Sequence, residues 1–286
     1  MKVIDDYFQL AKPRIIVLLL ITTAAAMVMA ARGIPPLALL FWTLLGGALA
    51  AGSAGALNCV FDADIDRVMA RTMLRPIPQG RVTPLQATVF AVILGVAGFA
   101  VLYLLVDPLA AWLSLAGNVF YVAIYTMWLK RATPLNIVIG GAAGAVPPLV
   151  GWAAVTNQIG GPALGLFALI FLWTPPHFWS LALMTETDYD KAHVPMMPNV
   201  AGEERTKREI IYYTVLLVLA SLLLYPLHVM GALYTAAAAV LGGIFLYDTF
   251  RTWKDEGTFW ARRTFKFSLL YLALMCLVMV VDRIVA

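Results

Sequence analysis

Apolar stretches of about 20 residues, each long enough to cross a bilayer as a helix, follow one another along almost the whole chain. Hydrophobic residues make up 62% of the 286 positions and charged residues 13%, whereas soluble domains carry about a quarter charged residues. Lipid must therefore cover much of the apolar surface. We predict an all-α, polytopic membrane protein with a single domain over residues 1–286. Its nine transmembrane helices would form a bundle around a cavity at bilayer depth. The predicted spans lie near residues 14–32, 37–57, 84–106, 108–128, 135–155, 162–184, 210–229, 231–250 and 265–285.

The charged residues are concentrated on one side of these nine spans. The N-terminal segment and alternate loops hold or adjoin all of the 20 Lys and Arg residues except Arg32 and Arg283. Because Lys and Arg favour the cytoplasmic side, we expect the N-terminus and these loops to be cytoplasmic and the C-terminus to lie outside. The acidic residues, which obey no such rule, share that side except for Asp107 and Asp282. This indicates a working face there. The loops concerned lie near residues 58–83, 129–134, 185–209 and 251–264.

The loop after the second span opens with an evenly spaced polar series. Asn58, Asp62 and Asp66 are four residues apart, so on a helix they share one face, whereas Asp64 points away. Oxygen ligands at this spacing suit Mg²⁺, which accepts one or two carboxylates together with phosphate oxygens. We predict that all three bind the metal and that Asp62 and Asp66 are catalytic through it. The alternative is a solvated helix end with Asp–Arg pairs.

Basic residues follow this series closely. Arg67, Arg71 and Arg75 recur at the same interval, and guanidinium groups bind phosphate bidentately. The short loop after the fourth span adds Lys130 and Arg131, which either bind phosphate oxygens or anchor a helix end among lipid headgroups. Acids for a metal beside bases for phosphate are typical of a metal-bound diphosphate site.

A second acidic cluster follows the sixth span. Glu186, Asp188 and Asp190 lie within five residues of one another and are followed by Lys191. A cluster on the same side of the membrane allows metal to be held from two sides. We predict that the three acids are metal ligands, that Asp188 is also catalytic, and that Lys191 binds diphosphate. A plain polar loop is the alternative.

Together these residues resemble the UbiA superfamily of intramembrane prenyltransferases. That family has an Asn-x-x-x-Asp-x-x-x-Asp motif after the second of nine helices, a basic Tyr-x-x-x-(x)-Lys segment, and a second acidic motif after the sixth helix. All three occur here in order. The chain is most similar to the protohaem IX farnesyltransferase branch, from which it departs at His193 and in PMMPNV at 195–200. The resemblance is carried by AKPRI at 11–15, DRVMARTMLRPIPQGRV at 66–82, YTMWLKRATPLNIVIGGAAGAVPPLVGWAAVT at 125–156, TPPHFWSLAL at 174–183 and DYDKAHVPMMPNV at 188–200.

The resemblance implies a reaction in which haem B, farnesyl diphosphate and water give haem O and diphosphate, with Mg²⁺ as cofactor. It implies the bacterial cytoplasmic (inner) membrane and leaves open an association with proteins of haem A synthesis or terminal-oxidase assembly. We expect no nucleic-acid partner. A sister prenyltransferase with a quinone precursor or another aromatic acceptor would keep both acidic motifs and lack TPPHFW. A membrane transporter fits poorly, because the middles of the spans are nearly free of charge.

Three further residues are candidates for contact with the haem acceptor. His177 lies inside the sixth span after Pro175-Pro176, a pair that we expect to interrupt the helix and open it to a cavity. Imidazole is a common haem ligand, so His177 either contacts haem or braces the kink as a hydrogen-bonded interior residue. His193 is a weaker candidate. Asn136 either orients the acceptor or only begins a closely packed span.

Overall fold

The computed structural model describes residues 2–285, and every regular element in that range is a helix. The predicted all-α fold class is confirmed. That the chain forms one domain stays a prediction. The elements are α1 (Lys2–Leu10), α2 (Pro13–Ala31), α3 (Leu37–Phe61), α4 (Ala63–Val68), α5 (Pro84–Leu105), α6 (Pro108–Val119), the π-helix η1 (Phe120–Leu129), α7 (Lys130–Ala132), α8 (Asn136–Thr156), α9 (Gly161–Met184), α10 (Glu186–Lys191), α11 (Met197–Ala201), α12 (Glu203–Leu223), α13 (Ala232–Lys254) and α14 (Phe259–Val285).

Local sequence signals explain where several helices begin. Proline occupies the first turn of α2, α5 and α6, where its missing N–H costs nothing. Thr83 and Gln86 form a capping box at the start of α5, and the Asp107 carboxylate accepts a hydrogen bond of 3.0 Å from the Ala110 amide at the start of α6. The Asp107 cap lets α6 begin only a few residues after α5 ends at Leu105.

Among residues 2–285, eight helices are long and apolar enough to cross a membrane. The ninth predicted span, near 210–229, differs from the structure at both ends. Its helix, α12, begins earlier, at Glu203, and ends at Leu223. Charged residues fill the first two turns of α12, so part of this helix is too polar to lie in lipid. The residues concerned are Glu203, Glu204, Arg205, Lys207, Arg208 and Glu209.

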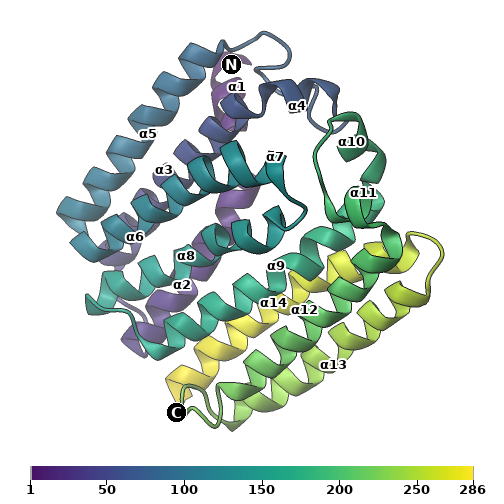
Figure 1. The fold of residues 1–286 in the computed structure, drawn as a ribbon. Helices are drawn as coiled ribbons and strands as arrows, with labels where there is room; N and C mark the ends of the chain where they lie inside the picture. The colour runs from purple at the N-terminus through teal and green to yellow at the C-terminus, as the bar shows by residue number, and fades with distance from the viewer. Residues whose placement is uncertain (1, 286) are drawn as a thin grey trace.

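The long helices pack side by side in a bundle (Figure 1). α9 lies against α8, α12 and α14, while α2 lies against α8 and α3 against α5. The α3–α5 pair approaches closely at glycines: a Cβ on Gly98 would lie 2.8 Å from the Ala50 amide nitrogen and 2.9 Å from the Gly46 carbonyl oxygen. Small residues that let backbones approach in this way are typical of helix packing in membranes. The cavity at bilayer depth stays a prediction.

The expected interruption at Pro175-Pro176 is wrong, because α9 runs through both prolines without a break. Both are buried, and the helix around them is enclosed by its neighbours. Proline removes one hydrogen bond from a helix, but packing against adjacent helices tolerates this loss in membrane proteins. The pair therefore does not by itself open the sixth span.

The connections that carry the predicted site gather at one end of the bundle. α1, α4, α7, α10 and α11 lie toward the end of the bundle that carries the N-terminus, and the C-terminus lies toward the opposite end (Figure 1). Segments that are far apart in the sequence thus meet at a single end of the molecule.

Candidate active site

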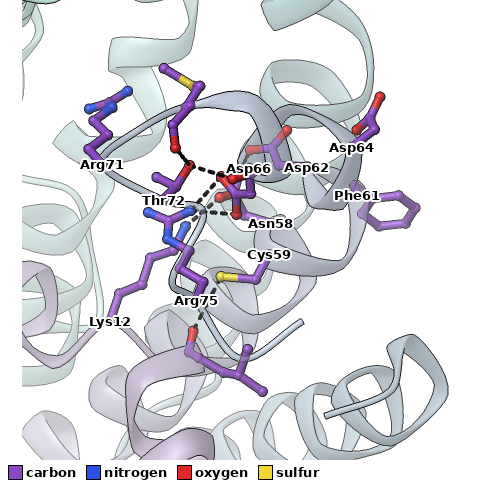
Figure 2. Close-up of polar contacts among 12 residues, drawn as sticks. Lys12, Asn58, Cys59, Phe61, Asp62, Asp64, Asp66, Arg71, Thr72 and Arg75 are labelled. Atoms are coloured by element: carbon purple, nitrogen blue, oxygen red, sulfur yellow. Dashed lines mark hydrogen bonds and ion pairs between the residues drawn. The ribbon is translucent and has the colours of Figure 1, made fainter. Parts of the chain in front are cut away.

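The structure places Asn58, Asp62 and Asp66 on one face, as their spacing predicts. Asn58 is on the last turn of α3, Asp62 is at the junction, and Asp66 is on α4. Helical hydrogen bonds continue through the junction, with 2.9 Å from the Asp62 amide to the Asn58 carbonyl and 2.8 Å from the Asp66 amide to the Asp62 carbonyl. All three side chains are buried, whereas Asp64 points away from them (Figure 2).

Cations surround this face. Lys130 Nζ lies 2.6 Å from Asp62 Oδ2. The Arg75 guanidinium donates to both oxygens of Asp66, at 2.9 and 2.7 Å. The Lys12 ammonium donates to Asn58 Oδ1 (Figure 2). Burial lowers the pKa of Lys12. Three positive groups from three separate segments therefore converge on Asn58, Asp62 and Asp66.

One carboxylate oxygen in this cluster has no partner. Asp62 Oδ1 is buried and accepts no hydrogen bond from any described residue, while Oδ2 accepts from Lys130 and, at 2.8 Å, from Asn58 Nδ2. An unpaired buried carboxylate oxygen is costly, so this atom has capacity for a further cation. Within residues 2–285, no three His, Cys, Asp or Glu side chains come close enough together to hold a metal. Asn58, Asp62 and Asp66 nevertheless match Mg²⁺, which needs only one or two carboxylates and takes its other ligands from substrate and water.

The π-helix η1 positions the groups that approach from the fourth long helix. Its wide turns bring Thr126 Oγ1 to 2.9 Å from the carbonyl of Tyr121, and Thr126 Oγ1 also accepts from Asn58 Nδ2 at 3.0 Å. Lys130 follows η1 directly, and its amide bonds to the carbonyl of Tyr125. π-Turns occur often at functional sites, and this one aims Thr126 and Lys130 at the acidic face.

The three equally spaced arginines do not share a face, because the helix that carries Arg67 ends at Val68. Arg67 is exposed. Arg71 crosses to α10, where its guanidinium lies 2.7 Å from the Tyr189 hydroxyl and 5.0 Å from the centre of that ring. Arg75 is the one that returns to the acidic face. Their binding of diphosphate stays a prediction.

The structure assigns the adjacent cations Lys130 and Arg131 to different partners. Lys130 faces Asp62, as described above. Arg131 binds both oxygens of Asp64, at 2.8 and 2.7 Å, and the Phe61 carbonyl at 2.8 Å. The hydrogen bond from Arg131 lowers the pKa of Asp64 to about 2. Of the two cations, Lys130 is therefore the better placed for a ligand at the acidic face.

The second acidic cluster meets the first loop through one of its three acids. Asp188 is partly buried, and its Oδ1 accepts a hydrogen bond of 3.4 Å from the Ala70 amide. Glu186 and Asp190 are exposed on α10, and Lys191 is also exposed. Metal binding by these three acids stays a prediction, and the geometry favours Asp188 over the other two.

His177 is held on several sides. Its ring stacks on Trp173 at 4.2 Å and on Phe265 at 4.7 Å between centroids, and its Nδ1 lies 2.7 Å from Ser268 Oγ. These contacts are those of the bracing alternative, in which a hydrogen-bonded interior histidine joins α9 to α14. Contact with haem stays a prediction.

Asn136 and His193, the other two candidates for contact with the haem acceptor, lie at the end of the bundle that carries the acidic face. Asn136 is fully buried at the start of α8, where its amide nitrogen donates to the Thr133 carbonyl at 2.6 Å and to the Pro195 carbonyl at 3.4 Å. The buried Asn136 Oδ1 finds no partner among the described residues. His193 is exposed, with a left-handed backbone at φ 51°.

Sequence reasoning missed three residues of this site. Lys12 belongs to the basic N-terminal segment and to the AKPRI stretch at 11–15, but no sequence pattern assigns it a role in the site. Thr126 carries no signal of its own inside an apolar span. Tyr189 stands between two predicted metal ligands, and its hydroxyl binds Arg71 instead.

The fold and these residues define an integral membrane protein with an acid-and-base site at one end of a helical bundle. A model of the UbiA prenyltransferase family matches residues 19–278, most of the chain. The chain belongs to the UbiA prenyltransferase family.

Two curated relatives are similar to the chain over nearly their whole length. The chain is 56% identical to the protoheme IX farnesyltransferase of Synechocystis sp., covering 99% of this chain and 90% of the relative. It is 56% identical to the protein of the same name from Gloeobacter violaceus, covering 98% and 92%. The branch that the sequence resembles is therefore confirmed.

Solved structures share the fold at low sequence identity. A digeranylgeranylglyceryl phosphate synthase superposes with a TM-score of 0.83 at 20% identity, covering 100% of both chains. A UbiA homologue from Archaeoglobus fulgidus, bound to GPP and Mg²⁺, gives a TM-score of 0.66 at 15% identity, covering 96% of this chain and 99% of that one. These likenesses show the fold.

Proposed function

We propose that this protein transfers the farnesyl group of farnesyl diphosphate to a vinyl group of haem B, with addition of water, giving haem O. The observation that carries the proposal is the buried Asp62 carboxylate, one oxygen of which has no partner among the described residues. Asp62 shares a helix face with Asn58 and Asp66, and three cations lie beside that face. The names of the relatives, at about half or more identity over nearly the full chain, support farnesyl and haem as the two substrates.

The diphosphate head of the substrate would bind at this end of the bundle. Asn58, Asp62 and Asp66 would hold Mg²⁺, and Asp188 on α10 would contribute from the second acidic cluster. The ion would neutralise negative charge that builds on the departing diphosphate. Lys130 and Arg75 already lie at the face, and they can turn from the carboxylates to phosphate oxygens once a metal neutralises the acids.

The farnesyl chain is apolar and would extend from this end into the bundle. Breaking the allylic C–O bond leaves the bonding electrons on the diphosphate and a positive charge on the farnesyl carbon. The π electrons of the haem vinyl group then form the new C–C bond. Water adds to the cation left on the haem side and releases a proton. The chain's part is to fix the leaving group and to exclude other nucleophiles until the vinyl group attacks.

We also propose that the site faces the cytoplasm from the bacterial inner membrane. The bias of Lys and Arg toward this end of the bundle supports the orientation, and the bacterial relatives support the location. A quinone-type acceptor is the second candidate, because sister enzymes of the family would share the acidic face. The transporter alternative is disfavoured, because the family is one of enzymes.

The test uses the purified protein in lipid nanodiscs with haem B and farnesyl diphosphate, followed by chromatography of the haems. We expect haem O with Mg²⁺ present and none after chelation, with activity restored when Mg²⁺ is added back. Haem O formation that is unchanged by chelation would overturn the metal-binding role of the acidic face.

A further inference from the structure

The N-terminal helix delivers one residue to the acidic face. Lys12 follows α1 and precedes Pro13, and its backbone is left-handed at φ 58°, ψ 58°. Side chains larger than glycine rarely adopt this conformation, so the surrounding structure must hold it. Its ammonium bonds to Asn58 Oδ1, on the same face as Asp62 and Asp66 (Figure 2).

Several contacts fix α1 in place without using Lys12. Asp6 is buried and pairs with Arg81 at 2.8 Å. The Tyr7 ring packs edge-on against Phe90 at 5.0 Å, and Leu10 is fully buried. The helix therefore has its own anchors on α5 and on the loop before it. The Lys12 amine is not needed to attach α1 to the bundle.

A close backbone contact fixes the point along α3 at which the chain before Lys12 packs. The Ala11 carbonyl oxygen lies only 3.0 Å from where a Cβ on Gly55 would stand, one turn before Asn58 on α3. The glycine lets the chain before Lys12 press onto α3. This close approach places a long cationic side chain beside the acidic face.

The balance of charge at this face indicates what Lys12 binds. Three cations, Lys12, Lys130 and Arg75, face two carboxylates, Asp62 and Asp66. The cations already outnumber the acids by one, and a divalent metal at the carboxylates would add two more positive charges. A diphosphate ester carries roughly three negative charges near neutral pH, which would balance this excess.

Resting on the proposed function, we infer that Lys12 is a substrate-binding residue for the diphosphate. When the substrate head enters, the Lys12 ammonium leaves Asn58 Oδ1 and donates to a non-bridging phosphate oxygen. The exchange frees the Asn58 oxygen for the metal. The N-terminal segment thus contributes one cation to the diphosphate site, in addition to Lys130 and Arg75.

The experiment measures binding of inorganic pyrophosphate with Mg²⁺ to the full-length protein, by thermal unfolding and by calorimetry. Lys12→Met and Lys12→Gln remove the charge, and glutamine keeps a donor for Asn58 if the methionine variant folds poorly. Arg14→Met is the matched control, because Arg14 is exposed two residues away. We expect the dissociation constant to rise at least tenfold in both Lys12 variants and less than twofold in Arg14→Met.

Steady-state kinetics separates substrate binding from a structural role. In Lys12→Gln the KM for farnesyl diphosphate should rise about tenfold while that for haem B changes less than twofold, and Lys12→Arg should recover part of the loss. If both Lys12 variants bound pyrophosphate as tightly as the wild type, the inference about Lys12 would be overturned while the proposed function stood. Equal rises in both KM values together with a lower melting temperature would have the same consequence. If the wild type itself neither bound magnesium pyrophosphate nor made haem O, the proposed function would fall as well.

Discussion

Replacing Asp62 by asparagine removes a charge from the centre of the site and almost nothing else. The side chain is 1% exposed and keeps its shape, so no cavity forms. Its ion pair with Lys130 becomes a hydrogen bond from the charged ammonium to a neutral amide oxygen, and a hydrogen bond with one charged partner still contributes about 1.5–3 kcal/mol. We therefore expect the free energy of unfolding to fall by only about 1–2 kcal/mol. The variant should insert and fold.

Catalysis should respond much more strongly than stability. A metal at a departing anion stabilises the transition state by several kcal/mol, and about 4 kcal/mol corresponds to roughly a 10³-fold change in rate. We expect kcat/KM of Asp62→Asn to fall by about that factor when haem O is quantified by chromatography.

Asp64→Asn is the matched control for this prediction. The Asp64 side chain is 65% exposed and pairs with Arg131 on the far side of the helix, an interaction of about 0.2–1 kcal/mol. Its kcat/KM should stay within about threefold of wild type. A loss below tenfold in Asp62→Asn, or equal losses in the two variants, would refute the assignment of the acidic face.

Three further predictions address other parts of the molecule. Lys130→Met should lower kcat/KM at least about 100-fold, whereas Arg131→Met should change it less than about fivefold; similar effects would show that both cations serve the substrate. Gly98→Val should destabilise the α3–α5 contact by about 1–3 kcal/mol in thermal unfolding, while Gly243→Val, which has open space around it, should not; equal melting temperatures would contradict the close packing. His177→Phe keeps the stacked rings and removes the ring nitrogens. If His177 contacts haem, the KM for haem B should rise about tenfold while the KM for farnesyl diphosphate stays unchanged. If neither KM changes, His177 only braces α9 against α14.

The acidic face could be predicted because it is local. Asn58, Asp62 and Asp66 lie one helical turn apart, and the helical hydrogen bonds continue through the α3–α4 junction. The same reasoning separated Asp64 from the series. It did not extend to Arg67, Arg71 and Arg75, because the helix ends at Val68 and a run of turns replaces the regular spacing.

The remaining features depend on contacts between distant segments. Lys12 reaches Asn58 across 46 positions of sequence, and Arg71 reaches Tyr189 across 118. No local pattern encodes such pairs. The π-helix at 120–129 has no apparent signal in an apolar stretch, and the unbroken course of α9 at Pro175 depends on its neighbours. The polar start of α12 was readable from its charges.

The most direct test of the central claim is a competition between acceptors. Purified protein in nanodiscs receives farnesyl diphosphate and Mg²⁺ together with equimolar haem B and a phenolic acid, and both products are quantified by mass spectrometry. We predict that haem O accumulates and that the phenolic acid stays unmodified. Prenylated phenolic acid without haem O would contradict the account and would assign the chain to the sister acceptor class.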